Sequence, residues 1–157
     1  MFREVSRKKQ ALSQQECIRL LQDERRGVLS VLTPEGYPYC MPINHYYHTD
    51  GHLYFHGGMK GHRVDALAEN DKVCFCVYDQ GFRREGEWAL NIKSVIVFGR
   101  MRIVHDPVKA LEVIRALSYH FTDDADYIES EIRKDAGHTL CMELIPEHIT
   151  GKITNEA

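Results

Sequence analysis

Residues 53–64 read LYFHGGMKGHRV, and within this stretch the pattern changes from that of a strand to that of a helix. A short apolar run leads into two consecutive glycines, and Lys60, His62 and Arg63 follow at the start of the expected helix. Because a helix N-terminus already carries free N–H donors and a partial positive charge, cations there are unfavourable unless an anion binds them. The stretch therefore predicts a site for a phosphate or another anion; the alternative is a solvated helix start.

The chain as a whole has the composition of a globular protein with one core. It contains 157 residues, 43% of them apolar, and has a formal net charge of -3. We expect a single domain over residues 1–157, with an N-terminal arm over residues 1–12 and a polar C-terminal tail over residues 147–157. The charge argues against duplex nucleic acid as a partner, so the basic cluster favours a small ligand.

Two further features concern the compartment. No apolar run approaches the roughly 18 to 20 residues of a membrane span, and the N-terminus lacks the apolar segment of a signal peptide. The five cysteines are odd in number and match no disulfide framework, which is typical of a reducing compartment. We therefore predict a cytoplasmic protein without a membrane segment.

Two of the cysteines, Cys74 and Cys76, alternate as CFC and so point to one face of a strand. Because the chain also has nine histidines, a metal site built from these residues is one alternative. We favour a structural role, since no CxxC pair or HxxxH helix accompanies them and a free cysteine behaves as a small buried hydrophobe. We predict no metal.

β-branched and apolar runs separated by hairpin turns predict an antiparallel fold. The six expected strands cover residues 28–33, 37–48, 53–56, 73–78, 94–104 and 138–145. Helices are expected after the capping box Ser13-Gln-Gln-Glu16, over residues 64–68, after Asp106-Pro107 and over residues 123–133. A small barrel closes such strands without exposed edges, so we predict a mainly β protein, an antiparallel barrel with peripheral helices.

The second expected strand, residues 37–48, contains Pro38 and Pro42, and neither can donate to a ladder. Either this is an edge strand or its pairing breaks around Pro42. A broken ladder would leave main-chain groups near Met41 to Asn44 free to contact a planar ligand.

Three other residues are candidates, each with a simpler explanation. His56, at the end of a strand, can exchange a proton near pH 7, although a lone histidine there is more often structural. Ser94 can donate to a phosphate, but serine at the start of a strand is common. Trp88, after a polar loop, can cover a ring system or seal an interface.

Four segments together resemble one known family. They are GYPYCMPI, LYFHGGMKGHRVDAL, NDKVCFCV and SVIVFGR, and the similarity extends from about Ser13 to Lys152. In order and spacing they resemble the flavin-binding split-barrel proteins related to pyridoxamine 5'-phosphate oxidase, most closely the branch named for 5-nitroimidazole antibiotic resistance. The resemblance implies a six-stranded antiparallel split β-barrel and a homodimer that holds FMN in two symmetric clefts between its subunits.

The resemblance also assigns residues to the cofactor. It implies that Met41, Pro42, Ile43 and Asn44 run along the isoalloxazine, that His56 and Gly57 lie near the ring and ribityl chain, that Lys60, His62 and Arg63 hold the phosphate, and that Ser94 with Lys93 completes the cleft. His56 is also the candidate functional residue beside the ring. A phosphate needs cations and a helix N-terminus, which agrees with the anion site predicted above.

The sequence departs from the oxidase proper. The oxidase has an arginine and a lysine where this chain has His62 and Arg63, and its C-terminal substrate-binding residues are not found after Leu144. We therefore expect a nitroreductase-like oxidoreductase that uses FMN, or the larger FAD, to reduce a small electron-poor compound such as a nitroimidazole. The alternative is a protein that binds or senses flavin or haem without turnover.

Overall fold

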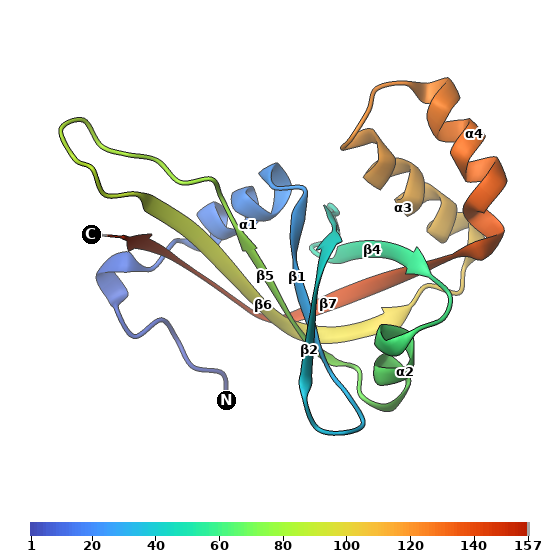
Figure 1. Ribbon diagram of the computed structural model, residues 1–157, viewed down its shortest axis with the longest axis horizontal. Helices are drawn as coiled ribbons and strands as arrows, with labels where there is room; N and C mark the ends of the chain where they lie inside the picture. The colour runs from blue at the N-terminus through green and yellow to red at the C-terminus, as the bar shows by residue number, and fades with distance from the viewer. Residues whose placement is uncertain (157) are drawn as a thin grey trace.

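A computed structural model describes residues 1–156, and a single antiparallel sheet is its frame (Figure 1). The strands are β1 (Arg26–Leu32), β2 (Pro38–Asn44), β3 (Tyr46–Tyr47), β4 (Leu53–Gly58), β5 (Lys72–Tyr78), β6 (Asn91–Ile103) and β7 (Thr139–Asn155). The helices are α1 (Gln14–Asp23), α2 (His62–Glu69), α3 (Pro107–Tyr119) and α4 (Ala125–Asp135), with short 3-10 turns η1 (Lys8–Gln10) and η2 (Ala136–His138).

The strand order explains how the sheet curls. It is β2-β1-β5-β6-β7-β4-β3, with antiparallel pairing between neighbours. β2 and β3 lie at opposite ends of this order, yet only His45 separates them in the chain. The two edges of the sheet must therefore meet at His45. This confirms the predicted mainly β, antiparallel split barrel with peripheral helices.

Two expectations about strand boundaries are wrong. β2 pairs with β1 without a break from Pro38 to Asn44, and the expected strand 37–48 divides at His45, so the sheet has seven strands instead of six. Pro42 is tolerated because β2 is an edge strand. The polar tail expected from residue 147 is instead part of β7, which pairs with β6 as far as Asn155. Residue 157 lies outside the described residues.

The core is built from alternate strand positions. Along β1 and β5 every second residue is buried, and the largest of these side chains, Leu29 and Phe75, pack with Phe55 of β4 and Leu21 of α1. The opposite face of the same strands is half-buried to exposed and remains largely apolar. Its large exposed side chains are Leu32 (40% exposed) of β1 and Tyr78 (56%) of β5, and the neighbouring strand β6 adds Phe98 (37%), which pairs with Cys74.

Two helices begin where their capping residues predict, α1 and α3. Ser13 and Glu16 form the expected capping box of α1, and the Asp106 carboxylate accepts from the N–H of Val108 at 2.9 Å at the start of α3. In Figure 1, α3 and α4 lie together above β4, whereas α2 lies below it. None of the helices in residues 1–156 has the length and apolar character needed to cross a membrane.

His45 is fully buried where the two sheet edges meet. Its Nε2 lies 2.8 Å from the carbonyl oxygen of Leu21, so Nε2 carries the proton and donates. The other nitrogen, Nδ1, is buried and has no hydrogen-bond partner in the described part of the chain. Burial is the main reason why the pKa of His45 falls to about 4. His45 is therefore neutral in the native state at pH 7.

This burial predicts a specific loss of stability in acid. In the unfolded chain His45 takes up a proton near pH 6.5, but the native state resists it until about pH 4. Between these values the unfolded state binds more protons, so the native state loses stability as the pH falls. From pH 7 to pH 4 the loss from this group is about 3 kcal/mol.

The variant His45→Gln keeps an N–H donor and cannot titrate in this range. We expect it to be less stable than the wild type at pH 7 but to lose about 3 kcal/mol less on acidification to pH 4. Urea unfolding at both pH values measures the two losses. Parallel pH profiles for wild type and variant would contradict the assignment.

Candidate functional site

The turn from β4 into α2 presents free backbone donors. β4 ends at Gly58, and α2 begins at His62. Gly61, directly before α2, has a φ of 123°, a backbone conformation that residues other than glycine rarely adopt. The Gly61 carbonyl accepts from Val64 N–H (2.8 Å) and Asp65 N–H (3.1 Å). The N–H groups of His62 and Arg63 have no hydrogen-bond partner among residues 1–156. They form the positive end of the helix.

Arg63 is the unusual side chain of this turn. It is half-buried, its Nε is fully buried without a hydrogen-bond partner, and no carboxylate in residues 1–156 lies within 4.0 Å of its guanidinium. Burial lowers the pKa of Arg63, and Tyr39 partly offsets this effect. Because a half-buried charge without a counter-ion is costly, the geometry is suited to binding an anion.

Gly57 makes this position of the guanidinium possible. A Cβ at Gly57 would overlap Nη2 of Arg63, so a larger residue there would displace the guanidinium from its place against the end of β4. This close approach explains one of the two consecutive glycines in the sequence.

Lys60 and His62 lie beside Arg63 on the surface. Both side chains are exposed, and neither forms an ion pair within the described chain. The ring of His62 packs edge-on against Tyr39 of β2, with centroids 4.7 Å apart. The predicted cations thus gather around the start of α2, and Tyr39, which sequence reasoning missed, joins them. The sequence did contain a hint of Tyr39, because it lies in the segment GYPYCMPI, two residues before Met41.

His56 lies at the exposed end of β4. Loss of solvent around the imidazole, followed by repulsion from Arg63, lowers the pKa of His56. At pH 7 the imidazole is therefore neutral, with one nitrogen able to donate and the other to accept. It can hold a proton next to a bound ring, but it adds no charge to the cationic cluster.

The predicted ring-binding segment is the edge strand β2. Met41 and Ile43 pack against the core, Pro42 is exposed, and Asn44 Oδ1 accepts from Arg26 Nε at 3.0 Å. Most side chains of this segment thus already contact other parts of the same chain. What the segment offers a ligand is its outer main-chain edge, because within residues 1–156 β2 pairs with β1 alone.

The structure does not bring Ser94 to the α2 cluster within one chain. Gly58, next to the cluster, pairs with Thr139 at the start of β7, whereas Ser94 pairs with Lys152 near its end. Thr139 and Lys152 are 13 residues apart, which corresponds to roughly 40 Å of strand. The two halves of the predicted cofactor set therefore lie at different ends of the barrel.

Lys93 and Ser94 also point to opposite faces of β6, as neighbours on a strand do. Ser94 lines a pocket of about 280 Å³ with Arg3 and Lys152, whereas the charge of Lys93 lies near Glu16 of α1. Only one of the two can face a given cleft. Arg3 and Lys152 were missed because both lie in segments expected to be an arm and a tail.

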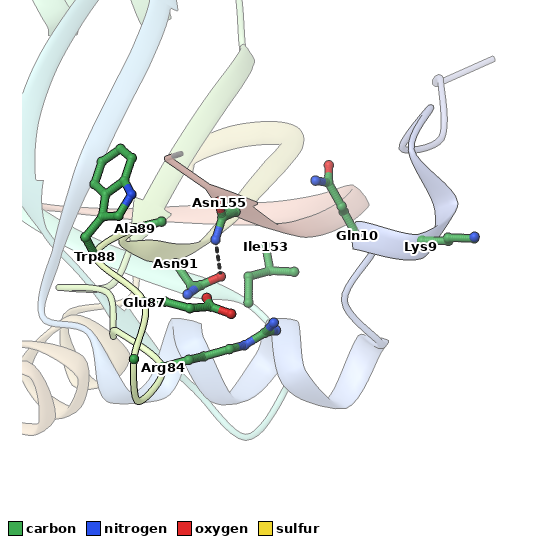
Figure 2. Close-up of a pocket in the computed structure, with 10 residues that line it drawn as sticks. Lys9, Gln10, Arg84, Glu87, Trp88, Ala89, Asn91, Ile153 and Asn155 are labelled. Carbon is green, nitrogen blue, oxygen red and sulfur yellow. Dashed lines mark hydrogen bonds between the residues drawn. The ribbon is translucent and has the colours of Figure 1, made fainter.

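A pocket of about 590 Å³ lies between the β5–β6 loop, the N-terminal arm and the end of β7 (Figure 2). Arg84 and Glu87 extend into it, the indole of Trp88 points away from them, and Asn155 Nδ2 donates to Asn91 Oδ1 at 3.0 Å. The predicted flavin residues are not among the described residues that line it. Trp88 lines the rim of this pocket and is 75% exposed.

The metal alternative finds no support in the geometry. Cys74 and Cys76 are half-buried on the outer face, and no third ligand joins them at metal-binding distance within residues 1–156. Among residues 1–156, the one group close enough to share a cation is Asp50, His52 and Glu143. Arg102 and Lys109 already pair with its carboxylates.

Comparison with a family profile decides the classification. The profile named pyridoxamine 5'-phosphate oxidase matches residues 13–153, most of the chain. The chain belongs to this family. The membership confirms the resemblance seen in the sequence. A comparison with curated proteins gave no significant match.

Solved structures of the family share the fold. A candidate 5-nitroimidazole antibiotic resistance protein from Bacteroides thetaiotaomicron is 18% identical, with a TM-score of 0.78 over 92% of this chain and 87% of its own. An FAD-binding protein from Mesorhizobium loti is 25% identical, with a TM-score of 0.70 over 92% of this chain and 96% of its own. An FAD-binding protein from Mycobacterium smegmatis is 24% identical, with a TM-score of 0.68 over 94% and 99%.

Proposed function

We propose that the protein binds a flavin between two copies of the chain and uses it to reduce a small, electron-poor compound such as a nitroimidazole. The observation that carries this proposal is Arg63, a half-buried cation at the free N-terminus of α2, whose buried Nε has no hydrogen-bond partner within residues 1–156. Family membership and flavin-binding structural neighbours support the same ligand.

The residues around α2 suit the phosphate of FMN. Arg63 can donate to it through the guanidinium, the N–H groups of His62 and Arg63 provide further donors, and Lys60 adds a charge at the surface. FAD carries a phosphate at the same place in its chain, and the FAD-binding neighbours make it the alternative cofactor. Gly57 allows the close approach, and the free edge of β2 with His56 is the proposed wall beside the ring.

The second wall of the cleft comes, in this proposal, from another copy of the chain. The outer face of β1, β5 and β6 carries exposed Leu32, Tyr78 and Phe98, and a pocket of about 220 Å³ is lined by Leu32, Cys74 and Phe98. Covering this apolar face in a homodimer would remove it from water. The same association would allow Ser94 and Lys152 of one copy to approach the α2 cluster of the other.

The chemistry belongs to the cofactor. When bound, a flavin would supply the two-electron chemistry that links a reductant, such as a reduced nicotinamide nucleotide, to an acceptor. Reduction of a nitro group to a nitroso group consumes two electrons and two protons and releases one water. The neutral His56 can hold one of these protons on a ring nitrogen, and the cations of α2 fix the position of the phosphate end.

We further propose that the protein carries out this reduction in the cytoplasm. All five cysteines are free, including the exposed Cys40, and this fits a reducing compartment.

The absorption spectrum of the purified protein tests the proposal. We expect flavin bands near stoichiometric occupancy, release of FMN or FAD identified by mass, bleaching by a reduced nicotinamide nucleotide and recovery when a nitroimidazole is added. Bands that bleach but do not recover would support a flavin protein without this reaction. A colourless protein that does not take up added flavin would contradict the proposal, and a Soret band would indicate haem.

A further inference from the structure

The N-terminal arm, residues 1–12, crosses one face of the β6–β7 pair and is attached at both of its ends. At the first end, the ring of Phe2 stacks on Phe98 of β6, with centroids 5.5 Å apart, and on His148 of β7, with centroids 5.1 Å apart. At the second end, the N–H of Leu12 donates to the carbonyl oxygen of Gly151 at 2.9 Å. In Figure 1 the arm runs from the N-terminus to the C-terminal end of β7 before the chain enters α1.

The first part of the arm is held by side chains instead of main-chain hydrogen bonds. No backbone group of residues 1–6 forms a hydrogen bond with another backbone group in residues 1–156. A pocket of about 280 Å³ lies between residues 3–6 and the strands β6 and β7. This part of the arm can therefore move relative to the strands without the loss of a main-chain hydrogen bond.

The strand wall of this pocket is polar at one end and apolar at the other. The register places Ser94 opposite Lys152 and Ile96 opposite Thr150, and all four residues line the pocket. Phe98 lines its other end. The two hydroxyl groups and the ammonium group of this wall are donors of the kind that bind phosphate oxygens.

Arg3 brings a second cation to the same pocket. Arg3 and Lys152 both line it, and neither side chain forms an ion pair within residues 1–156. Two unpaired cations in one pocket repel each other, and an anion between them offsets this repulsion. Glu4 is the only acid among the described residues that line the pocket; its side chain is 80% exposed, and its carboxylate lies 3.9 Å from Nε2 of His148. The net positive lining suits one phosphate group.

We propose that the arm closes over the phosphate of the bound flavin, and that Arg3 is a further phosphate-binding residue. The proposal rests on the proposed function, in which Ser94 and Lys152 of one copy approach the α2 cluster of the other. Phe2 is a positioning residue, because its stacked ring holds the neighbouring Arg3 beside the pocket.

The second copy of the chain would also hold the arm in place. The ring of Phe2 is 43% exposed and that of Phe98 is 37% exposed. Phe98 belongs to the apolar face that the proposed homodimer covers, so Phe2, which stacks on it, would be covered with it. Burial of both rings strengthens the attachment of the arm, so that Arg3 is fixed beside the pocket only in the assembled protein.

A comparison of FMN with riboflavin tests the role of Arg3, because riboflavin has the same ring and ribityl chain but no phosphate. We expect Arg3→Ala to weaken FMN binding by the apoprotein about fivefold, the loss of one exposed ion pair, and to leave riboflavin binding unchanged. The matched control is Arg7→Ala, which removes the same charge from an exposed position of the arm that does not line the pocket. Quenching of flavin fluorescence measures both dissociation constants.

Two more variants test the arm itself through the ratio of FMN affinity to riboflavin affinity. Phe2→Ala keeps every charge and removes the stacked ring, so we expect it to lower this ratio as Arg3→Ala does. Because the two residues act as one unit, the double variant should show no further loss. Glu4→Gln removes the acid of the pocket and should raise the ratio about twofold.

The outcomes separate this inference from the proposed function. A wild-type protein that takes up neither FMN nor riboflavin would defeat the proposed function and this inference with it. A wild type that binds FMN, together with an Arg3→Ala variant whose affinity ratio equals that of the wild type, would overturn the role of the arm alone. An equal fall of the ratio in Arg7→Ala would also overturn it, because the effect would then come from the overall charge of the arm.

Discussion

Arg63→Ala leaves the purified protein with less than about a tenth of the flavin that the wild type carries. The guanidinium is half-buried beside Gly57, has no carboxylate partner within residues 1–156, and lies at the free end of α2. A hydrogen bond to a charged group contributes about 1.5 to 3 kcal/mol, which corresponds to a 10- to 150-fold change in affinity. The measurement is the flavin Kd of the apoprotein, followed by quenching of flavin fluorescence.

The control for this prediction is Arg19→Ala. Arg19 lies on the exposed face of α1, where its side chain is 83% exposed and pairs with Asp23 at 3.9 Å, so its loss should leave flavin binding unchanged. His56→Gln should also retain most of the flavin, because the neutral imidazole adds no charge to the phosphate end, but reduction of the nitro compound should slow. If Arg63→Ala retained flavin and His56→Gln lost it, the assigned roles would be reversed.

Ser94→Asp is the second variant expected to remove the flavin, although Ser94 lies roughly 40 Å of strand away from the α2 cluster in its own chain. If a second copy places its Ser94 and Lys152 near the phosphate, a carboxylate there repels it. We expect at least a tenfold loss of affinity. The same titration measures this loss.

The control is Lys93→Ala, on the opposite face of β6, which should bind flavin like the wild type if Ser94 is the residue that faces the cleft. Wild-type flavin affinity in Ser94→Asp would contradict a role for this face.

Local signals in the sequence predicted much of the fold because they act over a few residues. The capping box of α1 and the Asp106 cap of α3 are formed as predicted. The end of β7 was missed because its apolar residues, Ile149 and Ile153, are few and separated by polar ones. The division of the second strand at His45 depends on closure of the sheet, which involves strands far apart in the chain.

The site was predicted where its residues are adjacent in the sequence. Lys60, His62 and Arg63 lie around one helix start, and a continuous stretch carries all three. That no carboxylate among the described residues pairs with Arg63 could not be predicted, because it depends on which carboxylates the fold brings near. Nor does the sequence reveal that Ser94 lies far from this cluster, since that distance follows from the register between β6 and β7.

The most direct test of a flavin cleft shared by two copies uses both variants together. Arg63→Ala and Ser94→Asp chains, carrying different affinity tags, are coexpressed, and the heterodimer is isolated by two successive purifications. In a two-fold symmetric dimer one cleft then carries both substitutions and the other carries neither. We predict about one flavin per heterodimer and almost none in either variant homodimer. A heterodimer that binds no flavin, while the wild type binds two, would contradict the shared cleft.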